Sequence, residues 1–171
     1  ERLPAAFHID TGLHRLGLPV RDVRRLVAEP SMMAGIDLDL VMSHLASADN
    51  PRDPKNREQL LTFETLSALF PGVPRSLAAS DGLMLGPSYH FDLVRPGYAL
   101  YGGQAFRGGP TPVSPVVTVH ARILQIRTLK AGESVGYSAT WVAKRPTRLA
   151  IVAAGYADGI ARALSDASGK K

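Results

Sequence analysis

Residues 38–76 read LDLVMSHLASADNPRDPKNREQLLTFETLSALFPGVPRS and carry the clearest fold signal in the chain. The apolar run at 38–44 predicts a strand, and residues 57–70 predict a helix because their apolar side chains recur at helical spacing. A further short strand is expected at 75–79. A helix between two strands is typical of parallel strands joined by a crossover connection, so this stretch favours an α/β fold.

The predicted helix at 57–70 has recognisable limits. A polar, proline-broken loop is expected before it at 49–56, and Pro71-Gly72 ends it. One face of the helix should pack on the sheet. The apolar side chains expected on that face are Leu60, Leu61, Phe63, Leu66, Leu69 and Phe70.

The same alternation extends in both directions. Residues 5–10 predict a strand, and Pro19 stands as the first residue of a helix that continues through 20–27. Residues 91–94 predict a fourth strand, which ends at Arg95. A (β/α)8 barrel needs eight strands and roughly 250 residues. The pattern therefore predicts the second half of such a barrel, or a small open sheet.

The chain changes character at residues 102–115, which are rich in Gly and Pro. Beyond them, apolar and polar residues alternate over 117–123, which predicts a half-buried antiparallel strand. A second strand is expected at 148–152. We therefore expect residues 1–107 to form a partial barrel and residues 108–171 to form part of an antiparallel β domain.

The composition excludes several classes of protein. Twenty basic and fifteen acidic residues give a net charge of +5, but the arginines are scattered apart from one block at 21–25, which argues against nucleic-acid binding. Cysteine is absent, so disulfides and thiolate metal sites are excluded. No apolar run reaches the roughly 18 residues of a membrane span, and no cluster of histidines and carboxylates has metal-ligand spacing. The chain does not begin with Met, and we expect it to belong to a longer gene product.

Asp10-Thr11-Gly12 is the short motif of aspartic proteases. Those enzymes need two such carboxylates that share a proton. Asp81-Gly82 and Asp158-Gly159 lack the middle hydroxyl residue, so no second motif follows. We expect Asp10 to close a turn with its side chain.

Polar residues follow the predicted strands of the first part. His44 ends the strand at 38–44, Ser80 follows the next strand, and Arg95 precedes Gly97 and Tyr98. The carboxyl ends of parallel strands meet at one edge of a sheet, where backbone N–H groups and a hydroxyl can bind a phosphate. Each residue alone also fits an ordinary turn or a structural histidine, so the phosphate site is a hypothesis.

Two tyrosines lie beside glycines in the second part, in Gly136-Tyr137-Ser138 and Gly155-Tyr156-Ala157. Such tyrosines usually mark turns or packing. Composition alone does not decide whether either is catalytic.

Taken in order, these stretches resemble the alanine racemase family, and the resemblance covers nearly the whole chain. Asp10 to Gly17 resembles the family's DTG-x-x-R-x-G stretch, and Ser43 to Asp49 resembles its T/S-H-x-A-x-A-D stretch. The other matching stretches are Arg95 to Gly102 (R-P-G-x-x-L-Y-G), Val135 to Tyr137 (V-G-Y) and Gly155 to Arg162 (G-Y-A-D-G-x-x-R).

The resemblance implies a pyridoxal 5'-phosphate enzyme with an N-terminal (β/α)8 barrel and a C-terminal β domain, working as a cytoplasmic homodimer. It would interconvert L-alanine and D-alanine and so supply D-alanine for peptidoglycan. Tyr137 matches a catalytic base that the partner subunit contributes, and Arg95 matches the arginine at the pyridine nitrogen. His44 would pack on the ring, while Ser80, Gly97 and Tyr98 would hold the phosphate.

The resemblance also assigns residues to the substrate. Arg15 matches a residue near the substrate carboxylate. The residues that match the lining of the substrate entrance are Asp49, Tyr156, Asp158 and Arg162.

Three positions depart from the family pattern. The Schiff-base lysine has no counterpart, since Lys55, Lys130, Lys144, Lys170 and Lys171 all lie in other contexts. His8 stands where many members carry a carbamylated lysine, and Ala79 replaces an asparagine before the phosphate-loop serine. We therefore expect a fragment without racemase activity of its own.

Two alternatives stay open. One is a related racemase of broad specificity, or one that acts on serine or lysine. The other is a non-catalytic barrel module that binds the cofactor, although a β domain containing Tyr137 argues against it.

Overall fold

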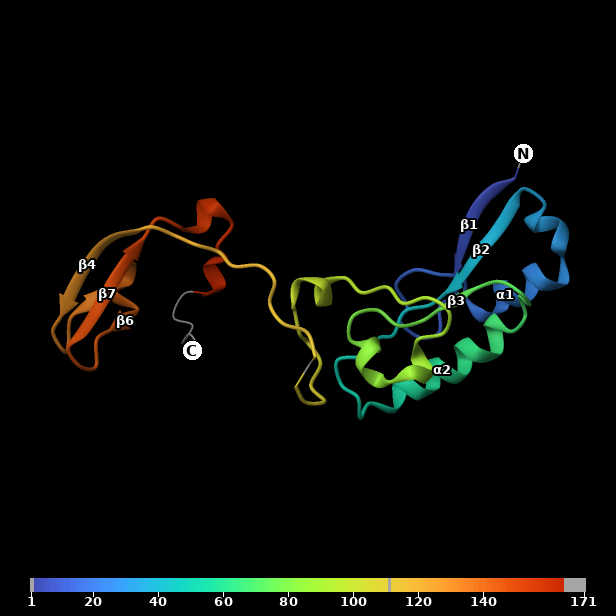
Figure 1. Cartoon of the computed structure of the whole chain (residues 1–171), viewed down its shortest axis with the longest axis horizontal. Coiled ribbons are helices and arrows are strands. Elements are labelled where there is room, and N and C mark those ends of the chain that lie inside the picture. Colours follow the sequence, from blue (N-terminus) through green and yellow to red (C-terminus); the bar gives the residue numbers. More distant parts are fainter. Residues whose placement is uncertain (1, 111, 165–171) are drawn as a thin grey trace. The chain divides into compact units, whose positions relative to one another are not determined.

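The computed structural model describes residues 2–110 and 112–164. The chain forms two compact units, Glu1–Val117 and Thr118–Lys171 (Figure 1). Within the described residues, no helix is long and apolar enough to cross a membrane.

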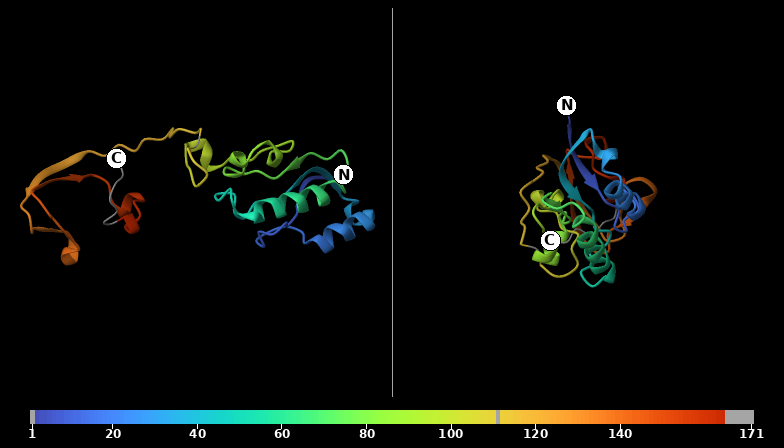
Figure 2. Two further views of the ribbon diagram at one scale, coloured as in Figure 1. Left: turned by 90° about the horizontal axis from the view of Figure 1, so that it is seen from below. Right: turned by 90° about the vertical axis from the view of Figure 1, so that its right-hand side faces the viewer.

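The first unit has a three-stranded parallel sheet in the order β1-β2-β3. β1 (Leu3–His8) leads to α1 (Val20–Ala28), β2 (Ile36–Met42), α2 (Pro54–Ser67) and β3 (Arg75–Ser76). This confirms the predicted alternation of strands and helices. The two helices lie along the same side of the strands (Figure 2), which is the arrangement that parallel crossover connections produce.

The predicted fourth strand at 91–94 is wrong. Phe91 has a φ of 53°, a left-handed conformation that breaks an extended chain. The backbone N–H groups of Asp92 and Leu93 both donate to the Arg75 carbonyl, so no regular ladder forms. The segment still follows the edge of β3, and one parallel bridge joins Ala79 to Arg95.

Both helix starts differ from the prediction, by one residue in α1 and by three in α2. Pro19 caps α1 and is not its first residue, because its ψ of 155° is extended. α2 begins at Pro54, inside the expected loop, where the Asp53 carboxylate accepts a hydrogen bond from the backbone N–H of Lys55. Proline fits this first helical position because its missing N–H would have no partner there.

The core of the first unit lies between the sheet and the helices. The strands contribute Phe7 and Val41, and α2 contributes Phe63, which is fully buried. The predicted α2 face is wrong at two residues, since Leu61 and Leu69 are exposed. On the same helix Asn56, Gln59 and Ser67 are buried in the company of Leu60, Phe63 and Leu66.

The second unit is antiparallel. β4 (Ile123–Leu129) pairs with β7 (Thr147–Val152), and β5 (Ser134–Val135) pairs with β6 (Trp141–Val142). The strand expected at 148–152 is confirmed. The one expected at 117–123 is wrong except at its last residue, because the ladder with β7 begins at the Ile123–Val152 pair.

Candidate functional site

A pocket of about 340 Å³ opens at the carboxyl ends of β2 and β3. Several of the predicted site residues lie here, because the residues that follow parallel strands come together at one edge of the sheet. The predicted site residues that line it are His44, Asp49, Ser80, Arg95, Gly97 and Tyr98.

Ser80 organises one wall of this pocket. Its hydroxyl oxygen accepts hydrogen bonds from the backbone N–H groups of Gly97, at 2.9 Å, and Ala99, at 3.3 Å. Ser80 itself is buried. The two N–H groups therefore converge on the Ser80 oxygen and fix it, while the Ser80 O–H remains able to donate to an anion in the pocket.

Tyr98 lies between those two donors, at the start of a single 3-10 turn (Tyr98–Tyr101). Burial and a hydrogen bond to Asp81 raise the pKa of Tyr98 to about 12. Its phenol therefore stays protonated at neutral pH and remains a hydrogen-bond donor.

Arg95 is fixed by the ends of two strands. Its guanidinium donates to the Ser76 hydroxyl and, at 2.5 Å, to the Ser43 carbonyl. Its backbone N–H donates to the Ala78 carbonyl at 2.9 Å. Burial lowers the pKa of Arg95 from its usual value, but a guanidinium still keeps its proton and acts only as a donor.

His44 shares a cationic neighbourhood with His8. Burial lowers the pKa of both imidazoles, and the positive charges of Arg95 and Arg15 lower it further. These effects therefore favour the neutral form of both rings. A neutral imidazole at His44 can pack flat against an aromatic ligand without the cost of burying a charge.

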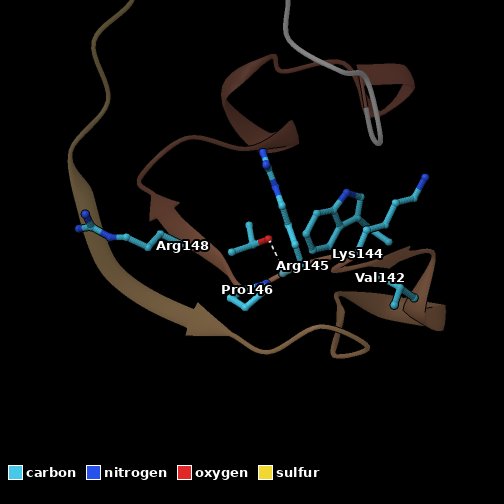
Figure 3. A pocket seen from close by; sticks show the side chains of 7 residues that line it. Val142, Lys144, Arg145, Pro146 and Arg148 are labelled. Carbon is cyan, nitrogen blue, oxygen red and sulfur yellow. Dashed lines mark hydrogen bonds between the residues drawn. The ribbon is translucent and has the colours of Figure 1, made fainter.

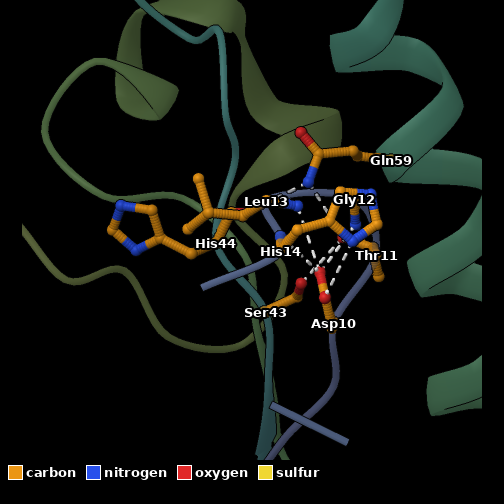
Figure 4. A network of polar contacts seen from close by, with 8 residues as sticks. All are labelled: Asp10, Thr11, Gly12, Leu13, His14, Ser43, His44 and Gln59. Atoms are coloured by element: carbon orange, nitrogen blue, oxygen red, sulfur yellow. Dashed lines mark hydrogen bonds and ion pairs between the residues drawn. The ribbon is translucent and has the colours of Figure 1, made fainter. Parts of the chain in front are cut away.

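Asp10-Thr11-Gly12 forms a turn, as expected. One Asp10 oxygen accepts from the backbone N–H groups of Gly12, Leu13 and His14, and the other lies 3.2 Å from the His14 imidazole (Figure 4). Partial burial raises the pKa of Asp10, but these backbone hydrogen bonds outweigh it and the pKa is lowered. Both oxygens of the Asp10 carboxylate are therefore engaged by residues of its own turn.

Arg15 follows this turn and is exposed, and it does not line the pocket. Its charge nevertheless acts on His44. Asp49, which does line the pocket, is held by Arg107 through a 3.3 Å ion pair and a 2.7 Å bond from the Arg107 backbone N–H to the Asp49 carbonyl.

Gln59 is a residue that the sequence patterns did not single out. It is buried in α2, and its amide bonds to Thr11, to the His44 carbonyl and to the Ala46 N–H. The signal was a polar residue within the apolar face of a helix, next to Leu60 and one turn before Phe63.

In the second unit, Tyr137 is 99% exposed and begins a tight turn (Tyr137–Ala139). Gly136, Ser138 and Ala139 all have positive φ, so the backbone turns sharply on both sides of the tyrosine. Such left-handed conformations are costly for residues other than glycine and are found at functional loops.

The remaining predicted residues of the second unit are also exposed. Tyr156 and Asp158 belong to one 3-10 turn, closed by a 2.9 Å bond from the Gly155 N–H to the Asp158 carboxylate. Arg162 begins another turn (Arg162–Leu164).

A second pocket, of about 490 Å³, lies at the connection between β6 and β7 and contains none of the predicted residues. Lys144, Arg145 and Arg148 are among its lining residues, but the Arg145 and Arg148 side chains point in different directions (Figure 3). The cations therefore do not converge on one ligand position.

Among the residues that the structure describes, no lysine lines the pocket at the ends of β2 and β3. Lys55 lies in the first turn of α2, and Lys130 and Lys144 belong to the second unit. Lys170 and Lys171 lie outside the described residues. The described residues also contain no group of three or more His, Asp or Glu that could hold a metal ion.

Comparison with known proteins assigns both units. Residues 1–105 match the family model of the alanine racemase N-terminal domain, and residues 116–170 match that of its C-terminal domain. The biosynthetic alanine racemase of Agrobacterium fabrum is 51% identical over 95% of this chain and 41% of its own length. A catabolic alanine racemase of Mesorhizobium japonicum is 47% identical over 98% of this chain and 44% of its own length.

Solved structures agree. The alanine racemase of Bartonella henselae with covalently bound pyridoxal phosphate has a TM-score of 0.79 at 39% identity, covering 94% of this chain and 45% of that chain. The biosynthetic enzyme of Pseudomonas aeruginosa has a TM-score of 0.83 at 36% identity, covering 94% of this chain and 46% of that chain. The chain thus spans less than half the length of these relatives. With both domain models matched in order along its sequence, it belongs to the alanine racemase family.

Proposed function

We propose that this chain provides the phosphate and pyridine subsites of an alanine racemase that interconverts L-alanine and D-alanine with pyridoxal 5'-phosphate. The observation that carries the proposal is the pocket of about 340 Å³, in which a hydroxyl with converging backbone donors and an anchored guanidinium occur together. The family membership of both units supports it.

The residues present fit this cofactor. Ser80, Gly97 and Tyr98 would hold its phosphate, with the Ser80 hydroxyl, fixed by the N–H groups of Gly97 and Ala99, as a donor and the protonated phenol of Tyr98 beside it. Arg95 would donate a hydrogen bond to the pyridine nitrogen. When bound, the cofactor withdraws electrons from the amino acid and makes its Cα proton removable.

The chain's own residues would set the protonation around that reaction. Arg95 keeps its proton and so would leave the ring nitrogen unprotonated, and His44 would pack in its neutral form on the ring face. Arg15 would attract the substrate carboxylate. Tyr137, exposed on its turn, would exchange the proton on one face of the substrate.

Tyr137 would act in the pocket of a second copy, so the enzyme would be a homodimer. Asp49, Tyr156, Asp158 and Arg162 would line the substrate entrance. The three parallel strands would belong to the second half of a (β/α)8 barrel, and the domain boundary would fall near residue 107. The enzyme would work in the cytoplasm, where it would supply D-alanine for peptidoglycan.

The opposing base would be a cofactor-bound lysine in a part of the full-length protein that this chain does not include. The test is a racemase assay on two proteins, the 171-residue chain and the full-length gene product, each incubated with L-alanine and pyridoxal 5'-phosphate. We expect D-alanine from the full-length protein only. Its absence there would contradict the proposal, and its appearance with the 171-residue chain would contradict the need for a further lysine.

A substrate panel separates the alternatives. Faster racemisation of serine or lysine than of alanine would indicate the related racemase. Cofactor binding by the full-length protein without racemisation of any amino acid would indicate a binding module. A matched Arg95→Leu variant should lose cofactor affinity in every case, while Arg127→Leu, an exposed arginine on β4, should not.

A further inference from the structure

Gln59 is a buried polar residue whose side-chain amide makes three hydrogen bonds, all to residues outside α2. Its relative exposure is 1%. Its side-chain nitrogen donates to the Thr11 hydroxyl at 3.1 Å and to the His44 carbonyl at 3.0 Å. Its side-chain oxygen accepts from the Ala46 N–H at 2.8 Å.

These contacts link two loops that carry site residues. The loop after β1 contains Thr11 and leads to Arg15, and the loop after β2 contains His44. In Figure 4, Gln59 reaches from α2 to this loop junction, whereas the His44 imidazole points away from it, so the backbone of His44 is held while its ring stays free.

A second set of contacts continues from Thr11 to Arg95. The Thr11 and Ser43 hydroxyls are 2.8 Å apart and share a hydrogen bond. The Ser43 carbonyl accepts from the Arg95 guanidinium at 2.5 Å. The amide of Gln59 is therefore separated from Arg95 by two residues, Thr11 and Ser43, both held in place by hydrogen bonds.

We propose that Gln59 is a positioning residue of the cofactor pocket, which fixes His44 directly through its backbone and Arg95 indirectly through Thr11 and Ser43. The inference rests on the proposed function, since that function assigns His44 to the face of the cofactor ring and Arg95 to its nitrogen.

The chemistry of the site requires an amide. Two N–H donors must meet an oxygen each, and one acceptor must meet the Ala46 N–H, which only asparagine or glutamine supplies among neutral side chains. The side chain is also enclosed, since Gln59 is only 1% exposed. Asparagine, one methylene shorter, would not span the gap.

The test compares Gln59→Met with Leu66→Val in the full-length protein. Methionine keeps the length and removes the hydrogen bonds, while Leu66, buried on the same helix, controls for lost packing. We expect Gln59→Met to weaken pyridoxal 5'-phosphate binding and lower kcat/KM by about tenfold or more, because misplacing a binding group by about an ångström has such effects. Leu66→Val should leave both within about twofold at a temperature where both variants are folded.

Amide hydrogen exchange without cofactor gives a readout that does not depend on activity. The Ala46 N–H should exchange about tenfold faster in Gln59→Met and at the parent rate in Leu66→Val, because only the first loses its acceptor. Thr11→Val is the second variant if Gln59→Met does not fold. It should keep Ala46 protected and weaken cofactor binding less than Gln59→Met.

Unchanged cofactor affinity in Gln59→Met, or equal losses in Gln59→Met and Leu66→Val, would overturn the inference. A parent protein that neither binds the cofactor nor racemises alanine would overturn the proposed function. In that case the exchange rate of Ala46 and the chemical shifts of the His44 imidazole still decide whether Gln59 holds this loop.

Discussion

At the scale of the residue, His44 is governed by its surroundings more than by its own chemistry. Burial and the charges of Arg95 and Arg15 all lower its pKa from the usual 6.5. His44 lines the pocket, and its backbone carbonyl accepts a hydrogen bond from the side chain of Gln59. A neutral ring beside a permanently protonated arginine is suited to packing on a cofactor and unsuited to competing with it for a proton.

The titration of His44 follows from this arrangement. By NMR, its pKa in the cofactor-free protein should lie below 6.5, and Arg15→Gln should raise it because one repelling cation is removed. Arg21→Gln, which removes an exposed arginine paired with Asp22, is the control and should leave it unchanged. A His44 pKa above 6.5 would contradict the arrangement.

The same shift has a consequence for stability. The unfolded chain takes up the His44 proton at about pH 6.5, whereas the folded chain takes it up at lower pH. The contribution of His44 to stability is therefore fully present above pH 6.5 and is lost as the pH falls below it.

At the scale of the element, α2 joins the core to the pocket. Its buried face carries Phe63 for the core and Gln59 for the site loops, while Leu61 is half-exposed. Phe63 packs edge-on against Phe91, with ring centroids 5.0 Å apart. The same contact holds the segment that leads to Arg95.

Phe63→Ala should therefore lower the free energy of unfolding by about 3–5 kcal/mol, because it removes a fully buried aromatic ring and leaves a cavity. Leu61→Ala, on the same helix, should change it by no more than about 0.5 kcal/mol. Urea denaturation of both variants measures the difference. Similar losses in the two would show that the helix face has been assigned wrongly.

The sequence predicted this helix, but it did not predict correctly which of its apolar side chains are buried. Periodicity placed Leu60, Phe63 and Leu66 on the buried face, and it also included Leu61, because a wide apolar stripe does not show where the core ends. The expected strand at 91–94 failed for a related reason. The apolar residues of this segment predicted a strand. In the structure, however, the Asp92 carboxylate accepts a hydrogen bond from the Arg75 N–H, and this contact takes the place of a regular strand pairing.

At the scale of the whole molecule, the chain consists of two units joined through a stretch without helices or strands. No strand or helix is found among the described residues between Tyr101 and Ile123. Arg107 is nevertheless tied to Asp49 by its side chain and its backbone. Protection from proteolysis should therefore end beyond Arg107.

Limited proteolysis with a protease of low specificity should first cut the 171-residue chain between residues 112 and 122, because backbone without a ladder or helix opens at low cost. Mass spectrometry should then find a stable fragment that ends near Val117. A first cut within α2 would contradict this division.

The sequence by itself determined the alternation of strands and helices, the antiparallel character of the second unit and the family, because these depend on local periodicity and on the order of short motifs. It also named six residues that line one pocket. Only the tertiary structure decided how the pocket is held. The hydrogen bonds from two backbone N–H groups to Ser80, from Arg95 to Ser43 and from Gln59 to His44 join residues 15 to 52 positions apart. Such contacts carry no local signal, since they form only when parallel strands bring their carboxyl ends to one edge.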